Sequence, residues 1–302
     1  MEDLNRSSAP SHWRDIQTAL GALGFSPGPV DGLPGPRTFG AVATYLEAAQ
    51  AGIASHGVLP GWVRAAILAQ HEAIPAPAPA PADLIHGIDV SGWQPKIKWS
   101  MVGAAGNRFA WIKISEGVRY RSEHRIPQFK GARSIGLAVG GYHYGRPEND
   151  AEKEARHFLS ALSLEPGDLP PVLDLEAGNK HNDEANAQWA LTWLDRVESE
   201  TGRIPMVYTA SWYVSGWLRH ASKELRARLA DYPLWWARYR GLGTGGAPDQ
   251  QSAQLISEHV RSRSEWAEWA VWQWTGKGSV PGVEGKCDRN VMRSDTLAGL
   301  TA

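Results

Sequence analysis

Pro170-Pro171-Val172-Leu173-Asp174-Leu175-Glu176 is an apolar run of strand length that ends in two acids. Segments with apolar residues at helical spacing lie on both sides of it, over residues 150–162 and 183–201. Asn182 is a candidate N-cap for the second helix, and Gly202 follows its last turn. A strand between two amphipathic helices is typical of parallel β/α units. The stretch therefore predicts an α/β fold.

The alternation of strand and helix continues outward from this stretch. Six more apolar runs have strand length, at Ile85–Val90, Phe109–Ile114, Leu137–Tyr144, Pro205–Ala210, Leu234–Arg238 and Ala270–Trp274. Seven or eight parallel strands within roughly 215 residues favour a closed barrel. We therefore predict an irregular (β/α) TIM-like barrel. In such barrels the chemistry lies at the carboxyl ends of the strands, so the ends of these runs are the places to search.

A proline-rich segment marks a domain boundary. Residues 74–83 read IPAPAPAPAD, in which every second residue from 75 to 81 is a proline that lacks an N–H and has a fixed φ. Such a segment favours a stiff polyproline II spacer. We expect it to separate a domain of residues 1–73 from a catalytic domain of residues 84–302.

The part before the spacer is predicted to be a small three-helix all-α domain. Its helices are expected over His12–Leu23, over residues 38–50, and around Trp62–Leu68, each with apolar residues on one face. A loop dense in Gly and Pro lies between the first two helices.

Composition excludes several kinds of protein. The net charge of −1 gives no electrostatic reason to expect a nucleic-acid or membrane-surface partner. The single cysteine, Cys287, rules out an internal disulfide and a multi-cysteine metal site, and we interpret it as a structural thiol. No His-Glu-x-x-His pair is present, so no metal site is predicted. No apolar run reaches about 18 residues, so no membrane insertion is expected.

The acid pair is the strongest chemical signal. Side chains two apart on a strand point to the same side, so Asp174 and Glu176 should share one face. Two neighbouring carboxylates repel each other, which raises the pKa of one, and a neutral acid at pH 7 can protonate a leaving glycosidic oxygen. The alternative is a hydrogen-bonded structural Asp beside a solvated Glu, which would be favoured for a lone Asp-x-Glu.

Further motifs accompany the acid pair in a fixed order. They are Gly87–Gln94, Trp111–Gly117, Gly140–Tyr144, Pro205–Thr209, Leu234–Tyr239, and Trp272–Trp274 with Cys287–Asn290. Over about residues 85–293 this series resembles the glycoside hydrolase family 25 lysozymes. The resemblance implies an irregular β/α barrel, without a cofactor, that hydrolyses the β-1,4 bond between N-acetylmuramic acid and N-acetylglucosamine in peptidoglycan.

Matching by motif assigns roles to single residues. The resemblance implies that Glu176 is the proton donor, that Asp174 is its companion, and that Asp89 and Asp288 line the same groove. It also implies sugar subsites at Trp93, Lys113, Tyr142, Tyr208, Trp236 and Gln273. Tyr144 stands where Phe is frequent in the family, and Ile114-Ser115 replaces a pair of small residues. His143 is expected to be a rim or core histidine.

The N-terminal loop Pro29–Thr38 resembles the Asp-Gly-x-x-Gly-x-x-Thr loop of three-helix peptidoglycan-binding domains. The matching residues are Asp31, Gly32, Gly35 and Thr38, with Thr38 a candidate cap of the following helix. The alternative is a capped turn in an unrelated helical bundle. Beside a muramidase-like domain, the loop predicts that peptidoglycan glycan strands are the partner of this unit too.

These observations predict a two-domain, monomeric muramidase of the phage endolysin type. Its start, MEDLNRSSAPSHWRD, does not resemble a signal peptide. We therefore expect synthesis in the host cytoplasm and release to the cell wall through a holin-type pore. The alternative enzyme is a chitinase-like or other amino-sugar hydrolase. The alternative from another class is a non-catalytic wall-binding protein on a decayed barrel, and the full set of acids argues against decay.

Overall fold

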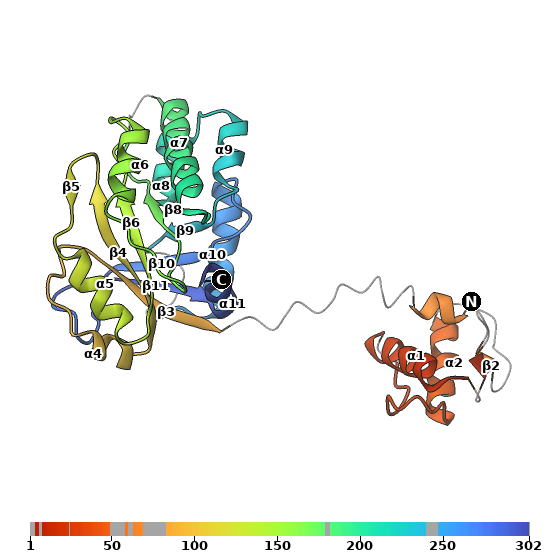
Figure 1. Ribbon diagram of the computed structural model, residues 1–302. Helices are drawn as coiled ribbons and strands as arrows, with labels where there is room; N and C mark the ends of the chain where they lie inside the picture. The colour runs from red at the N-terminus through yellow and green to blue at the C-terminus, as the bar shows by residue number, and fades with distance from the viewer. Residues whose placement is uncertain are drawn as a thin grey trace. The chain divides into compact units, whose positions relative to one another are not determined.

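A computed structural model describes residues 4–5, 8–23, 25–48, 58–59, 63–68, 83–178, 182–239 and 247–301 (Figure 1). The chain divides into two compact units, Met1–Ala80 and Pro81–Ala302. Apart from Asp83, the predicted spacer of residues 74–83 lies outside the described residues.

The first unit is helical, as predicted. The unit contains the helices α1 (Pro10–Ala22) and α2 (Pro36–Ala48) and a third helical segment over residues 63–68. The short strands β1 (Leu4–Asn5) and β2 (Val58–Leu59) pair antiparallel. The core contains Trp13, Ile16 and Leu20 of α1, Val42 and Tyr45 of α2, and Val63 and Ile67. Trp62, which was predicted to belong to the third helix, lies outside the described residues.

The second unit is a closed barrel, as predicted. Its strands are β3 (Leu84–Val90), β4 (Asn107–Glu116), β6 (Ala138–Tyr144), β7 (Val172–Asp174), β8 (Met206–Ala210), β9 (Leu234–Ala237), β10 (Val271–Gly278) and β11 (Cys287–Arg293). Around the barrel they follow the order β3-β11-β10-β9-β8-β7-β6-β4, and pairing of β3 with β4 closes the ring. The short β5 (Tyr120–Arg121) pairs antiparallel with the end of β4.

Strand β11 is the irregular element of the barrel. It runs antiparallel to both of its neighbours, β10 and β3, whereas the other strands of the ring pair in parallel. The sequence suggested only that this segment carries an acid. Its residues, CDRNVMR, include the polar run Asp288–Asn290 and end in Arg293, so the segment lacks the continuous apolar run of the other strands.

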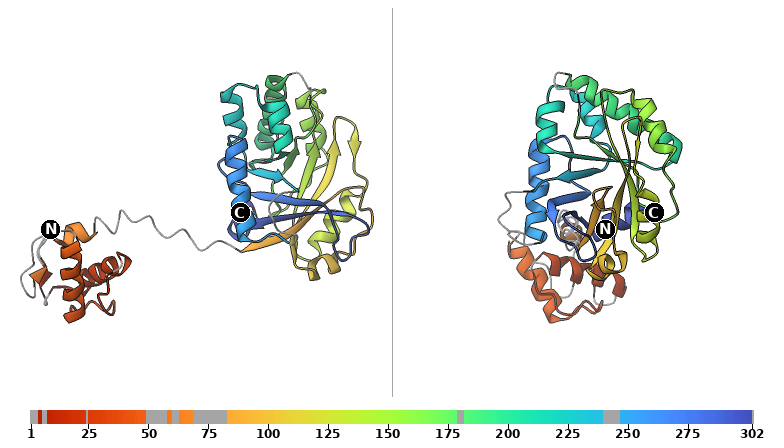
Figure 2. Two further views of the ribbon diagram at one scale, coloured as in Figure 1. Left: turned by 180° about the vertical axis from the view of Figure 1, so that it is seen from behind. Right: turned by 90° about the vertical axis from the view of Figure 1, so that its left-hand side faces the viewer.

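Helices cover the outside of the strands (Figure 2). They are α4 (Trp99–Ala104), α5 (Arg125–Arg133), α6 (Ala151–Leu159), α7 (Asp183–Thr201), α8 (Ser211–Tyr213) with the π-helical turn η1 (Val214–Leu218), α9 (Lys223–Leu229), α10 (Gln250–Arg263) and α11 (Ser294–Thr301). The predicted limits of α7 are confirmed. The Asn182 side chain accepts the N–H of Ala185 at 3.0 Å, and Gly202 ends the helix with a φ of 66°.

Large rings fill the lower part of the barrel interior. Phe109 and Trp111 of β4 are fully buried there, and the strands that flank β4 carry glycines at the facing positions. A Cβ on Gly140 would lie 2.4 Å from Trp111 Nε1, and one on Gly87 would lie 2.2 Å from Phe109 Cε2. Because these rings plug the interior, only the carboxyl end of the barrel is left open for a site.

Candidate active site

A pocket of about 280 Å³ opens at the carboxyl ends of the strands. All four predicted acids line it: Asp89 from β3, Asp174 and Glu176 from β7 and the residue pair after it, and Asp288 from β11. Five of the six predicted sugar-binding residues line it as well, namely Trp93, Lys113, Tyr142, Tyr208 and Gln273. The structure therefore brings together residues that are up to 199 positions apart in the sequence (Asp288 minus Asp89).

The β7 acids lie side by side in the pocket, although β7 itself ends at Asp174. Leu175 between them is fully buried on the opposite side, so the predicted alternation holds. Burial raises the pKa of Asp174 well above its usual value, and the charge of Glu176 adds to this effect. Burial also raises the pKa of Glu176, while the nearby Lys113 ammonium opposes the increase. Both effects favour retention of a proton by the pair.

One carboxylate oxygen of Asp174 has no hydrogen-bond partner among the described residues. Asp174 is 7% exposed, and its Oδ1 is buried and accepts no hydrogen bond from any residue that the structure describes. An unsatisfied buried carboxylate oxygen is costly. A donor N–H from a bound molecule would remove this cost.

Asp89 and Asp288 form a second acid pair across the barrel wall. They are direct partners in the antiparallel register of β3 and β11. Asp89 Oδ2 accepts hydrogen bonds from Gln273 Nε2 and Asn290 Nδ2, both at 2.8 Å. Burial raises the pKa of Asp89 to about 6, and burial together with the charges of Asp89 and Glu176 raises the pKa of Asp288 to about 8.

Gln273 is held by two tyrosines. Tyr208 Oη and Tyr239 Oη donate to Gln273 Oε1 at 2.8 and 2.6 Å, so the amide N–H of Gln273 is directed at Asp89. Sequence reasoning missed Tyr239, because it follows the end of β9 and is 53% exposed.

A salt-bridged clamp holds Tyr144 at the pocket wall. The Lys113 ammonium lies 4.8 Å from the centre of the Tyr144 ring, and the Arg146 guanidinium lies 4.7 Å from it. Both cations bind Glu116, Lys113 Nζ at 2.7 Å and Arg146 Nε at 2.9 Å. Although burial raises it, these hydrogen bonds hold the pKa of Glu116 below its usual value. The sequence showed only that Tyr144 replaces a frequent Phe.

Trp236 is not in the pocket, which corrects one predicted site residue. Its side chain is fully buried in the outer core beside His259 of α10, with 6.1 Å between the ring centres. Its neighbour Trp235 lines the pocket instead and donates from Nε1 to Asn290 Oδ1 at 2.9 Å. Successive side chains of a strand face opposite sides, and a Trp-Trp pair alone does not show which one points inward.

His143 is a core histidine rather than a rim residue. It is fully buried and lies between Ser115 and Glu154, each 2.8 Å from one ring nitrogen. Burial lowers its pKa, so the ring is neutral at pH 7. The network fastens α6 to the strands β4 and β6, outside the pocket.

The N-terminal motif residues surround a buried amide, that of Gln17. Gln17 Nε2 donates to Asp31 Oδ1 at 3.2 Å and to Thr38 Oγ1 at 3.4 Å, and its Oε1 accepts the Gly32 N–H at 2.9 Å. Gly32 requires its residue type, because its φ is +81°. Gly35, whose carbonyl accepts the Phe39 N–H at 3.1 Å, holds the cap position. Thr38 lies inside α2 and donates to Pro27 O, so the prediction that it caps the helix is wrong.

The described residues contain neither a membrane-spanning helix nor a metal-binding cluster. None of their helices has the length and apolar character needed to cross a membrane. Within the same ranges, no three His, Cys, Asp or Glu side chains are grouped so as to hold a metal ion.

A closed α/β barrel with two pairs of carboxyl groups at its carboxyl end suits glycoside hydrolysis, which uses a proton donor and a second carboxyl group. A sequence model of the glycosyl hydrolases family 25 matches residues 88–283, and the chain belongs to that family. It is 31% identical to lysozyme M1 of Streptomyces globisporus over 226 residues, which are 70% of this chain and 69% of the relative.

Two other comparisons extend this result. The structure of the bacterial lysozyme from Streptomyces coelicolor superposes with a TM-score of 0.58 at 27% identity, over 72% of this chain and 97% of that one. A D-alanyl-L-alanine endopeptidase of Streptococcus phage B30 is 26% identical over 209 residues, which are 68% of this chain and 42% of the relative. The protein is thus a family 25 lysozyme, or muramidase. Peptidoglycan as its substrate is consistent with the relatives that it matches.

Replacing Asp288 by Asn is expected to increase the stability of the fold while removing one of the four acids of the pocket. Its folded-state pKa of about 8 lies above the ordinary value of 3.8. Protonation of Asp288 therefore favours the folded state below about pH 4, and this contribution is lost as the pH rises to 8. Asp288→Asn removes this loss and should raise the free energy of unfolding at pH 8 by about 2 kcal/mol. The gain is smaller than the full pKa shift of Asp288 implies, because the protonation of the neighbouring acids readjusts when Asp288 is replaced.

Thermal unfolding at two pH values checks this expectation. At pH 8 the Tm of Asp288→Asn should rise by about 4–8 °C, and at pH 4 it should change little. An equal gain at both pH values would show that the charge of Asp288 is not the cause.

Proposed function

We propose that this muramidase hydrolyses the β-1,4 bond between N-acetylmuramic acid and N-acetylglucosamine, with Glu176 as the proton donor. The observation that carries the proposal is the β7 acid pair, in which Glu176 reaches solvent while Asp174 is buried beside it. A donor must contact the leaving oxygen and still hold its proton, and the burial that raises the pKa of Glu176 favours the protonated form.

Mass spectrometry of a digest of purified peptidoglycan tests the bond. Disaccharide products with muramic acid at the reducing end support the proposal. Products with glucosamine at the reducing end, or cleavage of chitin at a similar rate, favour the chitinase-like alternative. Absence of any products favours a non-catalytic wall-binding protein.

We infer that Asp174 steers the 2-acetamido group of the muramic acid. Asp174 and Glu176 share one edge of the pocket, so Asp174 is poorly placed to attack the sugar from the opposite face. Asp174 lines the pocket, where its carboxylate can accept the acetamide N–H, and the acetamide oxygen can then reach the anomeric carbon, as in substrate-assisted hydrolases. Asp89 and Asp288 hold the sugar and balance charge on the other side of the pocket.

The N-terminal unit is proposed to anchor the enzyme to the wall. Its support is the Asp31–Thr38 loop, which is folded around Gln17 within a separate compact unit. Tethering raises the local concentration of the catalytic barrel at an insoluble substrate.

Residues 84–302 alone are therefore expected to cleave short glycan fragments at the full rate but to clear intact sacculi about tenfold or more slowly. Parallel assays of the truncated and full-length chains on both substrates measure this difference. Equal clearing of sacculi by the two chains would show that the first unit is not an anchor.

We further propose that a phage uses this enzyme to lyse its host, with release through a holin-type pore. The similarity to a phage-encoded wall enzyme and the wall-binding loop support this setting. Cytoplasmic expression should leave cells intact until the inner membrane is permeabilised. Lysis without permeabilisation would contradict a need for a pore. We also expect the enzyme to act as a monomer, which the mass in solution tests.

A further inference from the structure

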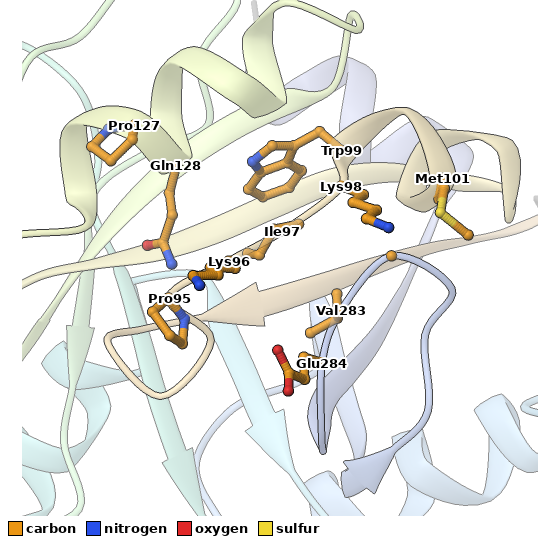
Figure 3. Close-up of a pocket in the computed structure, with 11 residues that line it drawn as sticks. Pro95, Lys96, Ile97, Lys98, Trp99, Met101, Pro127, Gln128, Val283 and Glu284 are labelled. Atoms are coloured by element: carbon orange, nitrogen blue, oxygen red, sulfur yellow. The ribbon is translucent and has the colours of Figure 1, made fainter.

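Figure 3 shows a second groove, of about 630 Å³. It adjoins the catalytic pocket, because Gln128 of the groove donates a hydrogen bond to the carbonyl of Ser91, which lines that pocket. Its walls are residues 95–101, the Pro127–Gln128 turn of α5, and the turn at Gly282–Glu284 between β10 and β11. Its volume falls within the roughly 300–1,000 Å³ of small-ligand sites. The mechanism above makes no use of this groove.

The groove is held in a fixed shape. The Lys98 N–H donates to Gly282 O at 2.8 Å, and Ile97 and Val283 pair in an isolated antiparallel β-bridge. These backbone contacts join two of the walls. Gly282 has a φ of +91°, and a Cβ there would lie 2.5 Å from Lys98 O. The close contact of the two walls thus depends on this glycine.

A buried amide joins the third wall and leaves one acceptor free. Gln128 is 3% exposed, and its Nε2 donates to Ser91 O at 2.9 Å and to Gln94 O at 3.0 Å. Its Oε1 is buried and accepts no hydrogen bond from the residues that the structure describes. A peptide N–H is a donor that would satisfy it.

The charges at the groove differ from those of the catalytic pocket. Lys96, Lys98 and Glu284 line it, and none of their side chains is paired with a residue in the described part of the chain. The floor between them is apolar, with Ile97 and Trp99. Two cations, one anion and an apolar floor fit a short peptide with several carboxylates, one ammonium group and methyl side chains.

The substrate carries such a peptide. The lactyl group of muramic acid bears the stem peptide of peptidoglycan. The carbonyl of Ser91 in the pocket accepts a hydrogen bond from Gln128 Nε2 of the groove at 2.9 Å, so the two cavities share a wall. A stem peptide of four residues can extend over about 13 Å, which is enough to pass from a sugar in the pocket into the groove.

We propose that this groove binds the stem peptide of a muramic acid residue whose glycan strand occupies the catalytic pocket. Lys96 and Lys98 bind its carboxylates, and Glu284 binds the ammonium group of its diamino acid. The inference rests on the proposed muramidase function.

The test compares glycan strands that carry stem peptides with the same strands after an amidase has removed them. Wild-type kcat/KM should be about three- to tenfold higher on the peptide-bearing strands, the gain expected from two partly exposed ion pairs. The double variant Lys96→Ala/Lys98→Ala should lose this preference and keep the wild-type rate on stripped strands. A control with the same loss of charge, Lys153→Ala/Lys223→Ala on exposed positions of α6 and α9, should keep it.

Each contrary result has a distinct meaning. A wild-type enzyme without preference, or a preference that survives in the groove variant, overturns the proposal. An equal loss on both strands would show that the groove binds sugar rather than peptide, which also overturns it. If neither strand is cleaved, the muramidase proposal fails by itself, and calorimetry with a synthetic stem tetrapeptide still tests the groove. The calorimetry uses the full-length chain that carries Glu176→Gln. The binding of the tetrapeptide to this chain must disappear when Lys96 and Lys98 are also replaced by Ala.

Discussion

Glu176→Gln is expected to fold normally and to lose about 10²–10⁴-fold in kcat, the usual contribution of a positioned general acid. The amide keeps the shape of the side chain but holds no transferable proton. Release of reducing ends from soluble glycan strands measures the loss. KM should change little, because Trp93, Tyr142 and Tyr208, which line the pocket and are the proposed sugar contacts, are unchanged.

Two comparisons separate the loss of the proton from a loss of structure. The Tm of Glu176→Gln should equal or exceed that of the wild type near pH 7, because the repulsion between Glu176 and Asp174 is removed. Glu258→Gln, on an exposed position of α10, is a control that should retain full activity. Near-wild-type clearing of cell walls by Glu176→Gln would remove this residue from the donor role.

The elements that local chemistry specifies could be predicted from the sequence. The limits of α7 follow from a capping side chain at Asn182 and a left-handed glycine at Gly202, both of which act within one helical turn. The β7 acids follow from the period of two along a strand. These features need no knowledge of the rest of the fold.

Contacts between distant segments could not be predicted in this way. The inward position of Trp235 rather than Trp236 depends on how β9 pairs with β8 and β10. The clamp on Tyr144 depends on Glu116 and Arg146, which are 30 positions apart and meet only because β4 and β6 are neighbours. The antiparallel direction of β11 depends on its pairing with β3, at the other end of the barrel domain.

Asp174→Asn is expected to lower kcat by about 10²–10³-fold, the cost of losing one oriented group that stabilises developing charge. In the proposed mechanism the Asp174 carboxylate, which lines the pocket, orients the acetamide N–H and stabilises the positive charge of the cyclised intermediate. An asparagine still fills the space but carries no charge. The reducing-end assay measures the change. Asp231→Asn, on an exposed position after α9, is the control and should keep the wild-type rate.

The stereochemistry of the first-formed product decides whether this loss has the proposed cause. If the acetamide attacks the anomeric carbon, water then enters from the original side with Glu176 as base, and the released muramic acid is first the β-anomer. NMR of a fresh digest, before mutarotation, distinguishes the two anomers. Removal of the acetamide from the substrate should reduce the wild-type rate about as much as Asp174→Asn does, and the two changes together should cost little more than either alone, because they remove the same interaction. An α-anomer formed first would instead mean that Asp89 or Asp288 activates a water across the pocket, and independent losses from the two changes would place Asp174 in a role separate from the acetamide.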